Sequence, residues 1–213
     1  MPLINKARYL LALHSSSENF GVAVIDLKDP NRKIKHAIFP GGRKLSNNIF
    51  TYIESLIPSK YWSQIARISV AKGPGGFTGT RLTVAIARTL AQQLDCSLDG
   101  ISSFSLMAPR LAENLSNLQR KNAFWIIKKL ERRGKIGGKY QITTNQDDFL
   151  PIELKEPFLL PLGIEVEPAV YVHEDLSKDI VKLIEISLLN HQKDIKSNWA
   201  DVLPNYPISP VNS

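Results

Sequence analysis

The feature that most constrains this chain is a glycine-rich turn between a short apolar run and a long helical pattern. The apolar run is residues 68–71, and it is followed by Lys72-Gly73-Pro74-Gly75-Gly76-Phe77-Thr78-Gly79-Thr80-Arg81. Glycine allows positive φ and close approach to the backbone, and Thr78 is a plausible N-cap for a helix that ends near Asp95. The pattern predicts a strand, a tight corner and a helix N-terminus.

Two interpretations of this corner stay open from the sequence alone. The free N–H groups at a helix N-terminus can bind an anion or a nucleotide. The corner can equally serve only to direct the helix. Its spacing matches neither the phosphate-cradling loop nor the dinucleotide-binding fingerprint, so glycine content by itself does not decide between them.

The helix after the corner carries two stripes at four-residue spacing. One stripe is apolar and contains Leu82, Ile86, Leu90 and Leu94, and the other contains only small residues, namely Gly79, Thr83, Ala87 and Ala91. A face of small side chains lets another helix approach closely. The small stripe either packs inside this chain or forms a seam with a second protein, and the spacing leaves both open.

The order of the predicted elements indicates the fold class. Apolar runs predict strands at 9–14, 20–26 and 34–39, joined by short turns that suggest an antiparallel meander. A helix at 43–57, a strand at 67–71, the helix after the corner, a strand at 98–101 and a helix at 103–118 follow. This order is typical of the ribonuclease-H-like core of the actin and sugar-kinase superfamily. We expect an α/β protein with a mixed sheet covered by helices.

The second half is less regular. Residues 122–129 favour a strand, 134–138 predict a hairpin turn, and 139–144 its return arm. Prolines at 151, 157 and 161 predict loops and short strands, and 174–192 predicts a helix before a proline-rich tail. We therefore expect two lobes, with residues 1–108 forming the ribonuclease-H-like lobe and 109–213 a smaller, reduced lobe that includes the C-terminal helix.

Residues for metal or nucleophilic chemistry are sparse. The single cysteine, Cys96, excludes an internal disulfide, and no two of the four histidines are spaced as a helical metal pair. An ATP-using actin-like enzyme needs an acid at the end of its first strand to hold a metal. Here that strand ends in His14, and hard cations prefer oxygen ligands. We expect no catalytic residue, no metal and no cofactor.

The positive charge is concentrated in one segment. Between Arg120 and Lys139 eight basic residues stand against one acid, a surplus equal to the whole net charge of +7. A basic surface can collect phosphate backbones, although most basic runs are solvated faces. Within this segment we regard Lys128, Lys129, Arg132 and Arg133 as candidates for RNA contact. No apolar run is long enough to span a membrane, so we expect a cytoplasmic protein.

The corner also resembles a known family. Gly73-Pro74-Gly75-Gly76-Phe77-Thr78-Gly79-Thr80-Arg81 is similar to the G-P-G-S-F-T-G-x-R signature of the TsaB (YeaZ) family. Supporting similarities lie in the first strand and in Gly100-Ile101-Ser102-Ser103-Phe104, where the family has G-V-S-T-L. The resemblance covers the first half of the chain well and the second half only loosely.

The resemblance implies a subunit that takes part in tRNA modification. TsaB supports its catalytic paralogue TsaD and the ATPase TsaE, which place a threonylcarbamoyl group on N6 of adenosine 37 in tRNAs that read codons beginning with A. It implies a non-catalytic role, indirect contact with tRNA through the complex, and no membrane. Helices of the first lobe would form the seam with TsaD or with a second copy of the chain, and on them we assign the residues Leu45, Ile49, Tyr52, Gly79, Thr83, Ala87 and Ala91.

The sequence departs from the family in three places. His14 stands where the family has aspartate, Gly76 replaces serine, and residues 122–129 replace the D-A-R-x-G-E-V-Y strand. Two alternatives to the scaffold hypothesis remain, an actin-like ATP-dependent phosphotransferase and a stand-alone RNA-binding protein that uses the basic segment.

Overall fold

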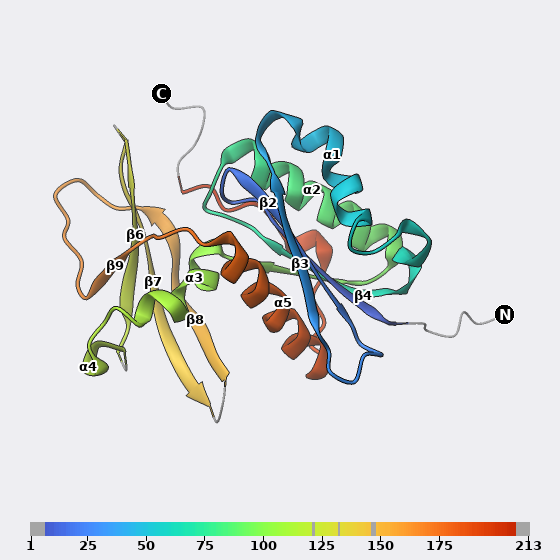
Figure 1. Cartoon of the computed structure of the whole chain (residues 1–213). Coiled ribbons are helices and arrows are strands. Elements are labelled where there is room, and N and C mark those ends of the chain that lie inside the picture. Colours follow the sequence, from blue (N-terminus) through green and yellow to red (C-terminus); the bar gives the residue numbers. More distant parts are fainter. Residues whose placement is uncertain (1–6, 121, 132, 146–147, 208–213) are drawn as a thin grey trace. The chain divides into compact units, whose positions relative to one another are not determined.

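The computed structural model describes residues 7–207 except 121, 132, 146 and 147, and it divides into two units (Figure 1). The first unit comprises the chain up to Ile101 together with Asp175–Pro204. The second comprises Ser102–Glu174 and the residues from Asn205 onward. None of the helices in the described part of the chain has the length and apolar character needed to cross a membrane.

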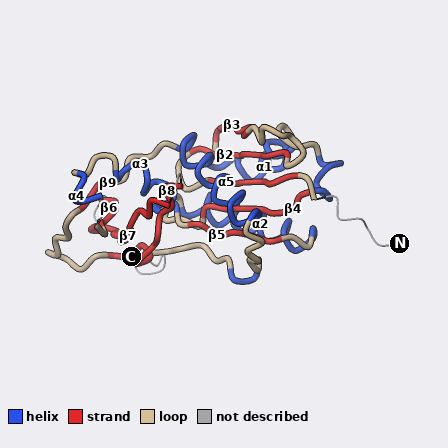
Figure 2. The backbone as a smooth tube through the Cα atoms, turned by 90° about the horizontal axis from the view of Figure 1, so that it is seen from below, coloured by secondary structure: helices blue, strands red, loops and turns tan. Residues whose placement is uncertain are grey.

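The first unit contains a five-stranded sheet in the order β3-β2-β1-β4-β5, and Figure 2 shows its strands lying side by side. Strands β1 and β2 pair antiparallel, as do β2 and β3, whereas β4 and β5 run parallel to β1. The predicted meander followed by helix-separated strands is confirmed. The strands are β1 (Tyr9–His14), β2 (Asn19–Asp26), β3 (Ile34–Pro40), β4 (Ile65–Ala71) and β5 (Ser97–Ile101).

Helices α1 (Leu45–Glu54) and α2 (Phe77–Leu94) cover one face of this sheet. In α1 the buried residues recur at four-residue spacing, which is the apolar face of an amphipathic helix. Helix α2 begins at Phe77 with Gly76 as its N-cap, so Thr78, the predicted N-cap, lies two residues after the actual cap. The helix ends at Leu94, and its C-cap Asp95 adopts a left-handed conformation.

Helix α5 (Leu176–Gln192) covers the opposite face and contacts β1, β2, β3 and β4 (Figure 1). The Asp175 carboxylate accepts a hydrogen bond from the Lys178 N–H and so caps the helix. An added Cβ at Gly21 would lie 3.4 Å from the Ile180 Cβ, an ordinary van der Waals distance, so α5 packs in direct contact with β2 at this position. The sequence-based division placed this helix in the second lobe, whereas here it completes the first unit.

A buried ion pair joins the far end of the chain to β4 and β5. Arg67 Nη1 lies 2.6 Å from Asp99 Oδ1, and both side chains are 3% exposed. The Ser197 hydroxyl donates to the same Asp99 oxygen across 2.8 Å, and Arg67 Nη2 donates to the Ile195 carbonyl. The pair therefore fixes the segment that follows α5 along the outer strand, where the Leu98 N–H also donates to the Ser197 carbonyl.

The second unit contains a four-stranded sheet in the order β8-β7-β6-β9. Helix α3 (Ser103–Ala112) contacts β7, β8 and β9 and shares a buried core with the sheet. The predicted helix 103–118 is divided, because α3 ends at Ala112 and the short α4 (Asn117–Arg120) follows. The strands are β6 (Phe124–Leu130), β7 (Gly134–Asn145), β8 (Asp148–Leu159) and β9 (Ala169–Tyr171).

The predicted hairpin turn at 134–138 is wrong, because these residues form the start of β7. Leu130 pairs with Gly134, so the chain reverses between these two residues, before the predicted turn. Side-chain packing explains two glycines in this strand, Gly137 and Gly138. An added Cβ at Gly137 would lie 2.9 Å from the Leu160 side chain, and one at Gly138 would lie 2.9 Å from the Tyr140 ring. Glycine at these positions makes room for large side chains.

The breaks predicted at Pro151 and Pro157 are also wrong, since β8 extends without a break to Leu159, whereas Pro161 lies in the loop that follows, as predicted. Pro151 and Pro157 lie in this strand, and Pro151 pairs with Ile142. Strand β8 is at the edge of the sheet. Proline has no backbone N–H to donate, and an edge strand tolerates this because its open side has no neighbouring strand to bond. The preference of prolines for loops therefore did not hold at this edge.

We predict that Asp99→Ala lowers the free energy of unfolding by about 3–5 kcal/mol, since it leaves the buried Arg67 cation without its partner. The measurement is urea unfolding followed by tryptophan fluorescence, because Trp62 and Trp199 both pack against the core of the first unit. Glu165→Ala is the matched control, because it breaks an ion pair with Lys135 in which Glu165 is 77% exposed. Equal midpoints for the two variants would contradict the prediction.

Candidate functional site

The glycine corner, residues 73–81, packs directly against the turn that follows β1. We call this turn, Ser15–Ser17, the serine turn. The Gly76 N–H donates to the Ser16 carbonyl across 3.1 Å. A Cβ added at Gly75 would lie 2.2 Å from the Ser16 carbonyl oxygen, a distance that no side chain tolerates. Only a residue without a side chain can bring the two backbones this close.

The same two segments are joined by side chains at the start of α2. The hydroxyl oxygens of Ser15 and Thr83 lie 2.7 Å apart and are buried. An added Cβ at Gly79 would lie 3.2 Å from the Ser15 carbonyl oxygen. The small residues at 79 and 83 therefore allow α2 to lie close to the serine turn.

His14 ends β1 directly below the serine turn. It is 1% exposed, and its Nδ1 accepts a hydrogen bond from the Ser16 N–H across 3.2 Å. Burial lowers the pKa of His14 from 6.5 to about 3, because the charged imidazolium would lose its hydration. The imidazole is therefore neutral near pH 7, and it acts as an acceptor that shapes the turn.

These contacts favour the interpretation of the corner as a device that directs α2. The space beside Gly75 is filled by the backbone of Ser16, and a neutral imidazole stands at the end of β1. Phe77 and Thr78 at the start of α2 are exposed, whereas Thr80 is buried, and the Arg81 guanidinium stacks on the Phe77 ring at 3.7 Å. Among the described residues, no three His, Cys, Asp or Glu side chains come together in a way that could hold a metal.

The structure places most of the seven residues assigned to the partner seam in the chain's own core. Five of them are buried, with at most 2% of each residue exposed: Leu45, Ile49, Thr83, Ala87 and Ala91. Gly79 faces Ser15, and Tyr52 stacks on the Phe39 ring with centroids 4.3 Å apart. The small stripe thus faces the sheet, because α2 packs across β4 and β1.

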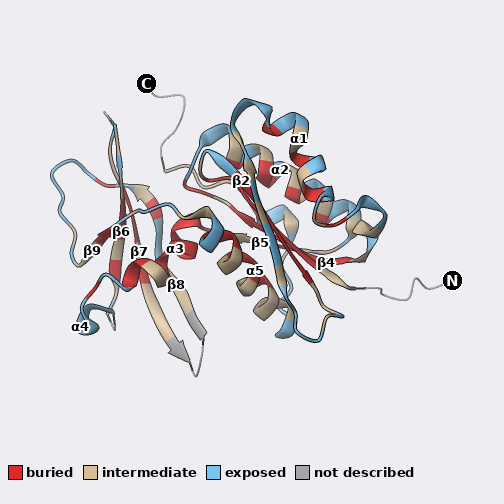
Figure 3. Cartoon of the chain, in the orientation of Figure 1, coloured by how far each residue is buried: buried red, intermediate tan, exposed pale blue. Residues whose placement is uncertain are grey.

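The outer surface of the same two helices carries different residues (Figure 3). Phe50 on α1 is 48% exposed and Phe77 on α2 is 38% exposed, which is unusual for large apolar side chains. The sequence analysis assigned neither residue to the partner seam, although Phe77 belongs to the glycine corner, because a four-residue period identifies the buried face of a helix and gives no signal for its outer face.

The structure separates the candidate RNA-contact residues. Lys128 pairs with Glu174 across 2.9 Å, whereas Lys129 lies over the Tyr171 ring at 5.0 Å. Adjacent residues of a strand point to opposite faces of a sheet, so these two lysines do not form one patch. Arg133 is exposed in the turn between β6 and β7, and Arg132 lies outside the described residues.

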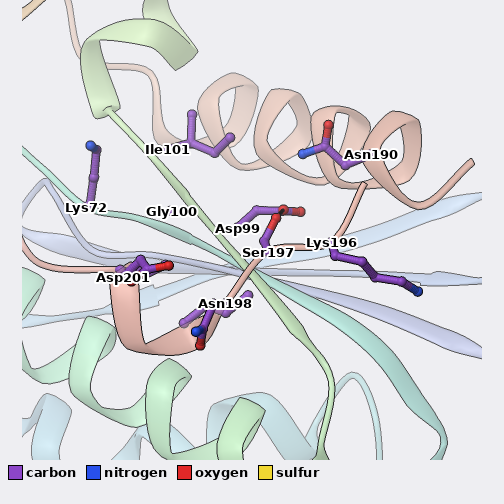
Figure 4. A pocket seen from close by; sticks show the side chains of 11 residues that line it. Lys72, Asp99, Gly100, Ile101, Asn190, Lys196, Ser197, Asn198 and Asp201 are labelled. Atoms are coloured by element: carbon purple, nitrogen blue, oxygen red, sulfur yellow. Dashed lines mark hydrogen bonds between the residues drawn. The ribbon is translucent and has the colours of Figure 1, made fainter. Parts of the chain in front are cut away.

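A pocket of about 370 Å³ lies beside β5, between the end of α5 and the segment after it (Figure 4). Asp99 and Ser197 point toward one another in it, while Lys196 points away and pairs with Asp194. Asp99 is already held by Arg67, and the lining mixes both signs of charge, so the pocket does not define an anion site. The residues that line it are Lys72, Leu98, Asp99, Gly100, Ile101, Asn190, Lys196, Ser197, Asn198, Asp201 and Val202.

The strand order and the helices on both faces of the first sheet define an actin-like α/β protein of the ribonuclease-H-like class. Two solved structures share this fold over nearly the whole chain. One is described as an uncharacterized protein with similarity to peptidase YEAZ from Pseudomonas aeruginosa, with a TM-score of 0.71, 17% identity, and coverage of 94% of this chain and 100% of that chain. The other is YeaZ from Pseudomonas aeruginosa, with a TM-score of 0.67, 17% identity, and coverage of 93% and 99%.

Sequence comparisons point to the same family. The model described as TsaD, tRNA N6-adenosine threonylcarbamoyltransferase, matches residues 40–118, which include the glycine corner. A segment of 44 residues is 46% identical to the tRNA threonylcarbamoyladenosine biosynthesis protein TsaB of Bacillus subtilis (strain 168). That segment covers 21% of this chain and 19% of the relative. Together the comparisons support a TsaB-like protein.

We predict that Gly75→Ala destabilises the protein by about 1–3 kcal/mol, because the new methyl group meets the Ser16 backbone and the corner must shift. Gly76→Ser is the matched control one residue away. A Cβ there would meet only the Ser17 carbonyl oxygen at 3.8 Å, and serine is a favourable N-cap. Urea unfolding of the two variants checks this, and equal loss in both would mean that the close contact has no special role.

We predict that burial of His14 makes stability depend on pH. Below about pH 6.5 the unfolded chain binds a proton at this residue, while the folded chain does so only near its lowered pKa of about 3. The free energy of unfolding therefore falls as the pH drops, and the His14 contribution between pH 7 and pH 5 is about 2 kcal/mol. Denaturant unfolding at the two pH values should show a smaller decrease for His14→Asn than for the parent.

The control for this experiment is His36→Asn, since His36 lies exposed on β3 with its ring 3.0 Å from the Ser177 hydroxyl. It should keep the pH dependence of the parent. A His14→Asn variant that loses as much stability as the parent between pH 7 and pH 5 would show that this imidazole is not buried neutral.

Proposed function

We propose that this chain is a non-catalytic partner subunit in the formation of N6-threonylcarbamoyladenosine at position 37 of tRNAs that read codons beginning with A. It supports a TsaD-type catalytic paralogue and a TsaE-type ATPase. The observation that carries the proposal is the glycine corner closed by the serine turn, with the Gly76 N–H bonded to the Ser16 carbonyl. The corner lies within the segment matched by the TsaD family model.

Two properties of the corner support a role without catalysis. Phosphoryl transfer requires carboxylate or other oxygen ligands for the metal that neutralises the phosphates. His14 stands at the end of β1 as a buried neutral imidazole, which offers no such oxygen. In addition, the Gly76 N–H, a donor that a phosphate-binding loop would use, is already bonded to the Ser16 carbonyl.

The docking surface we propose is the outer face of α1 and α2. It presents the exposed rings of Phe50 and Phe77, and the latter is stacked with the Arg81 guanidinium. Aromatic residues and arginine are the residues that most often dominate the energy of protein interfaces. The buried stripe of α2 sets the position of these residues, since it fixes the helix on the sheet.

The test of this surface is co-purification with a TsaD-type protein from the same source. Phe50→Glu should weaken the association by more than about tenfold, because a charge would be buried against the partner. Leu118→Glu is the control, since Leu118 is 78% exposed and lies in α4, outside the two helices. Thermal unfolding confirms that both variants are folded.

Different results would count against the proposed docking surface and against the proposed function. Normal pairing by a Phe50→Glu, Phe77→Glu double variant would exclude this face as the docking site. Failure of the parent chain to pair with any TsaD-type protein, with or without a TsaE-type ATPase and ATP, would count against the proposed function itself.

A further inference from the structure

The second unit has a sheet face that α3 does not cover. The core shared with α3 contains Phe124, Ile126, Ile136 and Tyr140, which lie on one side of the sheet. Side chains alternate along a strand, so the intervening residues point to the other side. We call this other side the outer face of the second sheet. Ile127 on this face is only 3% exposed, and Leu160 packs over its pairing partner Gly137. The rest of the face carries Trp125 and Lys129 of β6, Lys135 and Lys139 of β7, Lys155 and Phe158 of β8, and Tyr171 of β9.

The strand register brings these residues into rows across the sheet. Trp125 pairs with Lys139, which in turn pairs with Lys155. Lys129 pairs with Lys135 in a second row. A row of lysines directly opposite one another is unfavourable in isolation, because like charges repel across a strand pair. Such an arrangement is stabilised when an anionic partner lies over it.

Each of three lysines lies against an aromatic ring. The Nζ atom is 5.0 Å from the ring centroid for Lys129 and Tyr171, 5.8 Å for Lys139 and Trp125, and 4.1 Å for Lys155 and Phe158. The Trp125 and Phe158 rings are 6.2 Å apart. The rings are accessible, since Tyr171 is 51% exposed and the other two are half-buried. The surface thus combines cations with flat aromatic groups.

The fourth lysine, Lys135, is paired with Glu165 across 2.9 Å. Glu165 is 77% exposed and comes from the connection between β8 and β9. An exposed ion pair of this kind contributes little stability, so a phosphate group can replace the carboxylate without a large loss. Glu174 forms an ion pair with Lys128, and Lys128 lies on the opposite side of the sheet from Lys135.

We propose that the outer face of the second sheet binds single-stranded RNA, with phosphates on Lys129, Lys139 and Lys155 and bases stacked on the three aromatic rings. Base stacking on aromatic side chains of a positively charged surface is the usual recognition of single strands. An acidic protein segment would satisfy the lysines but would leave the rings without stacking partners. The choice of RNA over DNA rests on the proposed function.

The proposal is tested with the isolated full-length chain and a fluorescein-labelled single-stranded RNA of 12 nucleotides, by fluorescence anisotropy at two salt concentrations. The Lys129→Glu, Lys139→Glu double variant should bind more than tenfold more weakly and lose about 1.4 from the slope of log affinity against log salt. Tyr171→Thr, which keeps a strand-forming residue, should bind at least about fivefold more weakly with an unchanged slope.

Lys60→Glu is the matched control, because Lys60 also lies 5.0 Å from a tyrosine ring, that of Tyr61, but on the first unit. It should bind the RNA as the parent does. Circular dichroism establishes that each variant is folded, and ultraviolet crosslinking of the parent should attach the RNA to Tyr171 or Trp125.

Three results would overturn the proposal. The first is no RNA binding by the parent, and the second is an equal loss in Lys60→Glu and the double variant. The third is binding that is insensitive to Tyr171→Thr and equally tight for duplex RNA, which would indicate general attraction to polyanions. If the double variant instead loses only its TsaD-type partner, the face binds protein. Because pairing is measured separately, failure of RNA binding leaves the proposed function intact.

Discussion

The first unit depends on the burial of β1 on both of its faces. Residues 10–14 are at most 1% exposed, so apolar and neutral side chains point to both sides of the sheet. One side is covered by α1 and α2, which follow in the chain. The other side requires a second cover, and α5 supplies it from more than 150 residues farther along. The domain is therefore closed by a segment that the second unit separates from the rest of it.

The buried pair of Arg67 and Asp99 makes this closure specific. Their charges are removed from water. Arg67 donates to Asp99 and to the Ile195 carbonyl, and the Ser197 hydroxyl donates to Asp99, while Arg67 Nε and Asp99 Oδ2 have no hydrogen-bond partner among the described residues. A displaced C-terminal segment would leave buried charges with fewer partners, which is costly. The ion pair thus selects one position for the chain after α5, while the apolar contacts of α5 provide most of the burial.

The candidate site has the same origin in close packing. The glycine corner and the serine turn approach until their backbones touch, and the small residues of α2 bring the helix onto the turn. This packing fixes the direction of α2, while Phe50 and Phe77 stay exposed on the outer surface of the two helices. The second unit differs, because α3 covers one side of its sheet, and the other side carries lysines and partly exposed rings beside the buried Ile127.

The sequence by itself determined the fold class and the order of the elements in the first half of the chain, because hydrophobic periodicity and glycine-rich turns are local properties. It also located the glycine corner and the basic segment. It did not determine which face of α2 is buried, that Gly137 and Gly138 make room for Leu160 and Tyr140, or that Pro151 sits in an edge strand. Only the tertiary structure decided these features, because each depends on a neighbour distant in sequence. It also decided that α5 covers the first sheet and that Lys128 and Lys129 lie on opposite faces of the second sheet.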